Sequence, residues 1–251
     1  MSSVSIRAGR FGMPRGEICV MIVRAICSSG GSARFSDIVR FVLNRGSFDR
    51  HRIRQRIYYH LKRMCTRGIL VRKSKGIYEL NTIAPFCLIG LEYPHFSYIG
   101  GLGRRLGREE PEPLVATNKL EEELSKKFSG FRFARKIIIT TPEASDEWRD
   151  IIDKLSGMGF EFIMVSSSTL VDIRKMGDYL TSIVDRLKAG SIPIIDCTSL
   201  TKIYTIAAIE VATRECLPVI YIYEDTGELY WLIGIDEAMR RAIKKLLDLI
   251  Q

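Results

Sequence analysis

The chain has 251 residues, 46% hydrophobic and 27% charged, so it can bury the core of one large domain or of two smaller ones. These proportions exclude a wholly disordered protein, and no apolar run reaches the roughly 18 residues that a membrane-spanning helix needs. The charge is unevenly divided. Residues 1–82 hold 17 Lys and Arg against 4 Asp and Glu, a net charge of +13, whereas the remainder carries −4. This asymmetry predicts a nucleic-acid-binding part joined to a part of another kind.

The N-terminal stretch has no apolar segment like that of a signal peptide, so we expect a cytoplasmic protein. Six cysteines are present, none in a CxxC pair, which predicts free thiols that are mostly buried. There are only three histidines and none lies at ligand spacing from a cysteine pair, so we expect no metal site.

The basic part begins with two predicted helices. In the first, residues 14–31, apolar residues recur every four positions, with a proline in the first turn and glycines at the end. The second covers residues 34–46, with Ser36 as the expected cap and Gly46 as the stop.

A third helix and a hairpin follow. The helix covers residues 47–68, is capped by Ser47 or Asp49, and places its basic residues mostly away from its apolar face. Two short β-rich runs within residues 69–80 flank the polar turn 73–76, which is a hairpin signal.

Three helices followed by a hairpin resemble a winged helix-turn-helix domain, and the resemblance covers residues 14–82. It implies binding to double-stranded DNA, with a recognition helix in the major groove and a wing on the backbone or in the minor groove. The expected DNA-binding residues are Arg50, His51, Arg52, Arg54, Gln55, Arg56, Tyr59 and Lys62 of the helix and Arg72, Lys73 and Lys75 of the wing. The alternatives are a solvated basic face, a surface for protein contacts, or RNA binding.

After residue 83, short apolar runs alternate with helical patterns, which is typical of a parallel sheet covered on both faces. The expected strands end near residues 103, 141, 168 and 196; helices are expected at 118–128, 145–159, 169–190 and 201–216. A hairpin at 218–234 predicts an antiparallel edge. We therefore expect an α/β protein with a winged helix-turn-helix domain at 1–82, a Rossmann-like domain at 83–235 and an amphipathic helix at 236–251.

Open parallel sheets bind ligands outside the carboxyl ends of their strands. The residues there are rich in glycine and hydroxyl groups, which favours phosphate binding over acid–base catalysis. They are Tyr98, Gly100, Gly101, Leu102, Gly103, Thr140, Thr141, Ser166, Ser167, Asp196, Thr198, Ser199, Thr201 and Lys202. The glycines near residue 100 do not form the dinucleotide fingerprint, so we expect no required cofactor.

The loop after the fourth strand gives the most specific expectations. Asp196 can accept hydrogen bonds from turn amides, and Thr198 and Ser199 can donate to a phosphate or a ribose. Thr201 can cap the following helix, whose free N–H groups favour an anion beside the charge of Lys202. The alternative is an ordinary capped helix with a solvated lysine.

The segment IIDCTSLTKIYTIAA, residues 194–208, resembles the Asp-x-Thr-Gly-Gly-Thr-Lys motif of CARF domains, the Rossmann-like sensors of CRISPR-associated proteins. The matching residues are Asp196, Thr198, Thr201 and Lys202, whereas Ser199 and Leu200 stand where the motif has glycines. A leucine there either blocks close approach of the backbone or shapes a pocket for a base. Residues 97–103 resemble the first-strand ligand loop of that family, and the resemblance covers residues 85–234.

The CARF resemblance implies a homodimer that binds cyclic oligoadenylate across its two-fold axis as an effector. Its pairing with a winged helix resembles the CRISPR-associated transcriptional regulators of archaea, although there the winged helix follows the sensor. We therefore expect a ligand-controlled DNA-binding regulator with no membrane partner. Two alternatives are a ring nuclease that cleaves cyclic oligoadenylate and a dimeric DNA-binding protein that needs no ligand.

Overall fold

The computed structural model of the chain describes residues 15–29, 31–45, 48–80, 95–105, 110–128, 131–188, 191–223 and 226–250. They divide into two compact units. The first unit contains the described residues up to Leu80 and those from Ala242 onward, and the second contains residues 95–241. The expectations for Pro14, Gly30, Gly46, Ser47 and Cys87 fall outside the described residues. Within these ranges no helix has the length and apolarity needed to cross a membrane.

The first unit combines three helices with a small antiparallel sheet. Its elements are α1 (Arg15–Ser28), β1 (Ser32–Arg34), α2 (Phe35–Leu43), α3 (Arg50–Thr66), β2 (Leu70–Ser74) and β3 (Ile77–Leu80). The strand order is β1-β3-β2, with both pairs antiparallel. The predicted helices and hairpin are present. Strand β1 was not predicted, because three residues are too few to show an alternation of apolar and polar positions.

The starts of α2 and α3 show which of the predicted N-cap residues form cap hydrogen bonds. Asp49 caps α3 as predicted, because its Oδ1 accepts hydrogen bonds from the backbone N–H of His51 (2.9 Å) and Arg52 (2.8 Å). The prediction that Ser36 caps α2 is wrong, since Arg34 is the N-cap and forms no side-chain cap bond. Arg34 still pairs with Ile77 in the sheet, so the helix begins directly where the strand ends.

The core of the first unit comes from one face of each helix. Ile18, Ile22 and Ile26 of α1 are fully buried, as the four-residue spacing predicts. The inner face of α3 buries Ile57 and Leu61 in the same way. Because this face is apolar, the charged residues of α3 lie on its other faces.

The second unit is built on a six-stranded sheet. Its elements are β4 (Phe96–Leu102), α4 (Glu112–Lys127), β5 (Phe133–Thr140), α5 (Pro142–Glu147), α6 (Arg149–Gly157), β6 (Phe160–Met164), α7 (Ser167–Leu170), α8 (Ile173–Leu187), β7 (Ile192–Asp196), α9 (Lys202–Glu215), β8 (Val219–Tyr223), β9 (Glu228–Ile233) and the start of α10 (Ile235–Ile250). The strand order is β6-β5-β4-β7-β8-β9, all parallel except for β9. This is a Rossmann-like α/β sheet with the predicted antiparallel edge.

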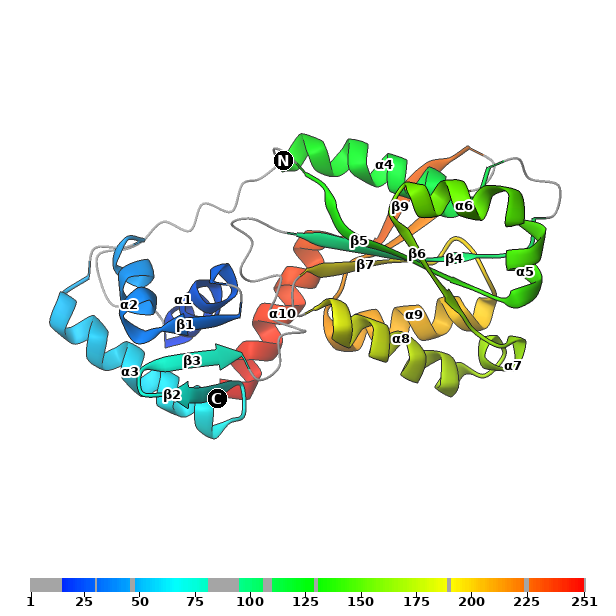
Figure 1. Ribbon diagram of the computed structural model, residues 1–251. Coiled ribbons are helices and arrows are strands. Elements are labelled where there is room, and N and C mark those ends of the chain that lie inside the picture. The colour runs from blue at the N-terminus through cyan, green and yellow to red at the C-terminus, as the bar shows by residue number, and fades with distance from the viewer. Residues whose placement is uncertain are drawn as a thin grey trace. The chain divides into compact units, whose positions relative to one another are not determined.

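Helices cover both faces of this sheet: α4 and α6 lie on one face, and α8 and α9 on the other (Figure 1). Every residue of the central strands β4 and β7 is buried, which explains their continuous apolar runs. The short helices α5 and α7 lie at the end of the sheet where the parallel strands finish (Figure 1).

Two predicted helices are each divided in the structure. The predicted helix 145–159 is the pair α5 and α6, and α5 starts before residue 145 because Thr141 caps it by accepting from the N–H of Ala144. The predicted helix 169–190 is the pair α7 and α8. Here Asp172 caps α8 by accepting from the backbone N–H of Arg174 and Lys175, which ends the preceding turn.

Candidate functional site

The residues predicted to bind DNA lie mainly on the solvent side of α3. The exposed ones on this helix are Arg50, His51, Arg52, Arg54, Gln55, Tyr59 and Lys62, while Arg56 is half-buried. Tyr58 and Tyr59 expose 53% and 59% of their surface, and their rings lie edge-on to those of Phe35 and His60. The exposed cations of this face suit contacts with the phosphates of a polyanion.

A hollow of about 250 Å³ lies between α2 and α3. It is lined by Ser36, Val39, Arg40, Leu43, Asn44, Arg50 and Arg54. Sequence reasoning missed Ser36, Arg40 and Asn44, although their four-residue spacing places them on one side of α2. Arg54 also contacts Phe35, with its Cζ 5.8 Å from the ring centroid.

The hairpin formed by β2 and β3 presents the three cations that were predicted for a wing. Arg72, Lys73 and Lys75 are exposed, and β2 is an edge strand of its sheet. Lys73 Nζ lies 3.2 Å from Glu79 Oε2, which offsets part of its charge. The left-handed backbone of Gly76 (φ +79°) closes the turn.

In the second unit, the chain reverses its direction of winding between β4 and β7. From β4 the chain continues to β5 on one side, whereas from β7 it continues to β8 on the other. In parallel sheets this switch point, outside the carboxyl ends of the two strands, is where ligands bind. The loops that meet there are residues 103–105 after β4 and residues 197–201 after β7.

Asp196 is a fully buried carboxyl group at the switch point. Its Oδ2 accepts a hydrogen bond from the Tyr98 hydroxyl (2.6 Å), and its Oδ1 accepts from the Thr198 N–H (2.8 Å) and hydroxyl (2.5 Å). Burial raises the pKa of Asp196, and the bonds from Thr198 and Tyr98 oppose this shift. Burial and the neighbouring carboxyl raise the pKa of Tyr98 well above its usual value, so its hydroxyl keeps its proton.

Gly100 leaves room for the bond between Tyr98 and Asp196. A Cβ at Gly100 would lie 2.2 Å from the Tyr98 hydroxyl oxygen. Gly100→Ala must therefore displace this hydroxyl, and we expect the second unit to lose about 2 kcal/mol of its free energy of unfolding. Urea denaturation followed by tryptophan fluorescence measures this loss, because Trp148 and Trp231, the two tryptophans of the chain, lie in the second unit.

The matched control is Gly177→Ala in the middle of α8. A Cβ at this position would meet nothing within 4 Å, so the substitution should stabilise the unit by roughly 0.5–1 kcal/mol. If Gly100→Ala is as stable as the unchanged chain, the Tyr98 hydroxyl is not confined in this way.

Thr198 and Thr201 hold the loop after β7. Thr198 donates its hydroxyl hydrogen to Asp196 and accepts from the Ile222 N–H (2.8 Å), so this hydrogen points inward and not toward a ligand, in contrast to its predicted role. Thr201 caps α9 as predicted, because its Oγ1 accepts from the Tyr204 N–H (3.1 Å). It also donates to the Leu170 carbonyl oxygen (3.1 Å), which ties α9 to α7.

Ser199, Leu200 and Lys202 have properties that suit contact with a ligand. Ser199 is 5% exposed, and its buried hydroxyl has no hydrogen-bond partner among the described residues. Leu200 has a left-handed backbone, with φ +74°. Lys202 is exposed in the first turn of α9 and pairs with no carboxylate in the described parts of the chain. The helix N-terminus and this unneutralised cation together favour an anion.

The other predicted strand-end residues differ in accessibility. Thr140 is buried and donates to the Leu102 carbonyl oxygen (3.1 Å), so it joins β5 to β4. Gly101, like Leu102, is buried within β4. Ser166 and Ser167 are exposed; the first caps α7, and the second donates to Glu143 Oε2 (3.4 Å).

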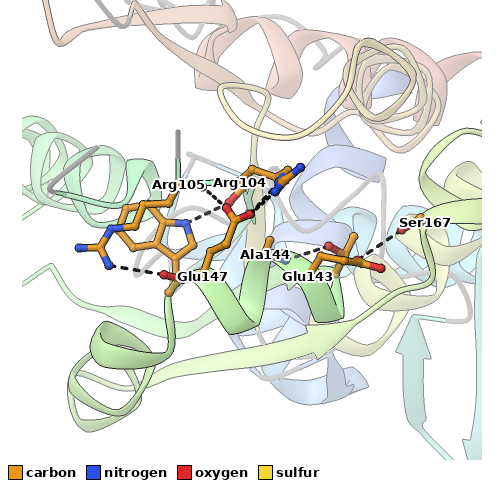
Figure 2. Close-up of polar contacts among 9 residues, drawn as sticks. Arg104, Arg105, Glu143, Ala144, Glu147 and Ser167 are labelled. Atoms are coloured by element: carbon orange, nitrogen blue, oxygen red, sulfur yellow. Dashed lines mark hydrogen bonds and ion pairs between the residues drawn. The ribbon is translucent and has the colours of Figure 1, made fainter. Parts of the chain in front are cut away.

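Two arginines that follow β4 are held by carboxylates of the same unit (Figure 2). Arg104 Nε donates to Glu147 Oε1 (2.7 Å), and the backbone N–H of Arg105 donates to Glu147 Oε2 (2.8 Å). The Arg105 side chain reaches Asp150 (2.9 Å) and lies over the ring of Trp148. Hydrogen bonds from the two arginines hold the pKa of Glu147 below its usual value. These cations are neutralised locally, whereas no carboxylate of the described residues pairs with Lys202.

Among the described cysteines, Cys19, Cys65 and Cys197 are free thiols. Burial raises the pKa of Cys19 to about 11 and that of Cys197 to about 12, so neither is a thiolate at neutral pH. Within the described ranges no three His, Cys, Asp or Glu side chains gather closely enough to hold a metal ion.

No protein-family model matches the chain, and no curated protein matches it. Solved structures do match. Can2 from Sulfobacillus thermosulfidooxidans, in complex with cyclic tetra-adenylate, aligns with a TM-score of 0.39 and 16% identity over 55% of this chain and 35% of its own. The protein VC1899 from Vibrio cholerae aligns with a TM-score of 0.42 and 16% identity, over 56% of this chain and 34% of its own.

Csm6 of Enterococcus italicus, bound to cyclic hexa-2′-fluoro-hexa-dAMP, aligns with a TM-score of 0.40 and 9% identity over 62% of this chain and 39% of its own. The chain thus spans little more than a third of the length of these structures. TM-scores below 0.5 do not establish a shared fold, and identities this low assign no family.

Proposed function

We propose that the chain is a CRISPR-associated DNA-binding regulator, in which the second unit binds a cyclic oligoadenylate and the first unit binds DNA as a winged helix-turn-helix domain. The observation that carries the proposal is the start of α9. There the N-terminus of the helix meets Lys202 and the buried Ser199 hydroxyl at the switch point of the sheet, and neither group has a partner among the described residues.

An anionic ligand fits this place for electrostatic reasons. Among the described residues of these loops and the first turn of α9, Arg104 and Arg105 are paired with Glu147 and Asp150, whereas the charge of Lys202 is left for a ligand. The start of α9 adds to this attraction, because the first N–H groups of a helix have no partner within the helix and favour an anion, although Thr201 caps that of Tyr204. A phosphodiester of a cyclic oligonucleotide provides the negative charge that both groups require.

The resemblance of residues 196–202 to the CARF motif supports the choice of cyclic oligoadenylate among such anions. Asp196 is the most buried residue of this segment, and its bonds to Tyr98 and Thr198 hold the end of β7 and the loop in a fixed conformation. In this proposal Asp196 positions the loop, while Lys202 and Ser199 contact the ligand.

DNA binding by the first unit is supported by the order of its elements and by its charge. The exposed cations of α3 and of the β2–β3 hairpin lie on two elements that are joined directly in sequence. In winged helix-turn-helix domains these two elements enter the groove and contact the backbone. The local net charge of +13 favours phosphate contacts.

We propose a homodimer through the second unit. Ile206 and Ile209 of α9 expose 50% and 38% of their surface, one and two turns beyond Lys202. A second copy related by a two-fold axis would cover these residues and bring two lysines to one ring-shaped ligand. The ligand controls DNA binding only if it binds one arrangement of the dimer more tightly than another.

Calorimetry with cyclic tetra-adenylate tests the ligand. The unchanged chain should bind the ring, and Lys202→Ala should weaken binding at least about tenfold, because a charge-assisted contact to a phosphate is lost. The matched control is Lys154→Ala, which removes an exposed lysine from α6 and should leave the dissociation constant unchanged.

Two outcomes would contradict the proposal. If no ring size binds, the second unit is not a sensor of cyclic oligoadenylate. If the ring binds equally well to the chain and to Lys202→Ala, the ligand lies elsewhere.

A further inference from the structure

Leu200 adopts a backbone conformation that costs free energy. With φ +74° it lies in the left-handed region, which glycine enters freely and asparagine tolerates, but which is strained for leucine. Among the described residues only Cys216 shares this property without being glycine, and Cys216 ends a helix, where such a conformation is common. Leu200 lies within a loop that precedes a helix, so its conformation requires another explanation.

The side chain of Leu200 fills a space above Gly101. A Cβ at Gly101 would lie 2.3 Å from Leu200 Cγ and 2.4 Å from Cδ1, so any larger residue at position 101 would displace the leucine. Gly101 belongs to β4, and Leu200 follows β7, the neighbouring strand. The leucine therefore lies between the two strand ends that define the switch point.

Two polar groups flank this leucine. Ser199 precedes it with a buried hydroxyl that has no partner in the described part of the chain, which is a costly arrangement. Lys202 follows it with an exposed ammonium group. The strained leucine thus lies over a glycine, next to a hydroxyl with no described partner and close in sequence to an exposed cation, and such polar groups can orient a ligand.

We propose that Leu200 is a specificity-determining plug, whose side chain occupies the place that an adenine base of the ligand takes over Gly101. This inference rests on the function proposed above. In this proposal the face of the purine lies over Gly101, where the leucine side chain lies in the structure. Ser199 then gains a hydrogen-bond partner on the base or the ribose, and the phosphate lies at the start of α9 beside Lys202.

In this proposal a molecule is open, and able to bind, only when the leucine side chain has left its place over Gly101. Because open molecules are a minority, the apparent dissociation constant is raised by the inverse of their fraction. Leu200→Gly should relieve the backbone strain and empty the space in one step. We expect the dissociation constant for cyclic tetra-adenylate to fall at least about tenfold, with a faster association rate. Leu200→Met refills the space, and its dissociation constant should stay within about twofold of that of the unchanged chain.

A double-mutant cycle tests the contact without any ligand. Gly101→Ala should lower the urea midpoint, reported by tryptophan fluorescence, in the unchanged chain. In the Leu200→Gly background the same substitution should have a much smaller effect. Asparagine tolerates the left-handed backbone, so Leu200→Asn is a second variant with a smaller side chain at this position.

The outcomes separate this inference from the proposed function. If the chain and Leu200→Gly bind the ring equally well, the second unit is a sensor but Leu200 is no plug. Weaker binding by Leu200→Gly, or additive effects in the cycle, would also overturn the plug. If neither protein binds any ring, the proposed function fails, and the plug fails with it.

Discussion

Replacing Asp196 with alanine should lower the free energy of unfolding of the second unit by about 3 kcal/mol. The substitution leaves the buried Tyr98 hydroxyl and the N–H and hydroxyl of Thr198 without their acceptor. Removing a buried carboxyl group offsets only part of this loss. Urea denaturation followed by the fluorescence of Trp148 and Trp231 measures the effect.

Asp196→Asn is the control, because it keeps the shape and one acceptor oxygen; its free energy of unfolding should fall by less than half as much.

Asp196→Asn also tests the pKa of the Asp196 carboxyl group. The pKa of Asp196 is raised in the folded chain, so the folded state holds the proton of this group more tightly than the unfolded state does. The stabilisation that results from this difference is fully present at pH values below the usual aspartate pKa of about 3.9. That contribution is lost as the pH rises through the folded pKa. Asparagine does not titrate, so the advantage of the unchanged chain over Asp196→Asn should shrink above about pH 4. An advantage that grows with pH would contradict this assignment.

Replacing Arg52 and Arg54 together with alanine should weaken binding of a short mixed-sequence DNA duplex roughly 100-fold at low salt. Both side chains are exposed near the start of α3, and Arg54 also lines the hollow between α2 and α3. If each arginine holds a phosphate, the slope of log affinity against log salt concentration should fall by about 2. Fluorescence anisotropy of the labelled duplex over a salt series gives both quantities.

The matched control removes two exposed arginines of the second unit, Arg149 and Arg174. It changes the net charge equally, so it measures the general effect of charge on DNA affinity. Equal losses in the two double variants would mean that the basic charge attracts DNA without α3 being its contact surface.

Local signals in the sequence predicted most of the fold. The apolar runs of β7 and of the second half of β5 were recognised because buried parallel strands need no alternation of polar residues. Asp49 and Thr201 were recognised as helix caps because a cap acts on amides two or three residues away. The loop after β7 could be chosen as a ligand site because parallel strands all end at one edge of their sheet.

Contacts between distant segments could not be predicted in the same way. Tyr98 and Asp196 come from different strands, and nothing near either residue indicates the other. The pairing of Arg104 with Glu147 likewise depends on how α5 crosses the end of the sheet. The inward role of Thr198 follows from its bond to the Ile222 N–H, which exists only once β8 lies beside β7.

Because Leu200 and Gly101 are in contact, substitutions at these two positions can be accepted in one order only. A side chain can be added at position 101 only after position 200 has become small, because the two compete for one volume. A glycine at position 200, by contrast, is acceptable at any time, since it suits the left-handed backbone. In directed evolution for tighter ligand binding, changes at position 200 should therefore be recovered first, and changes at position 101 only in their descendants.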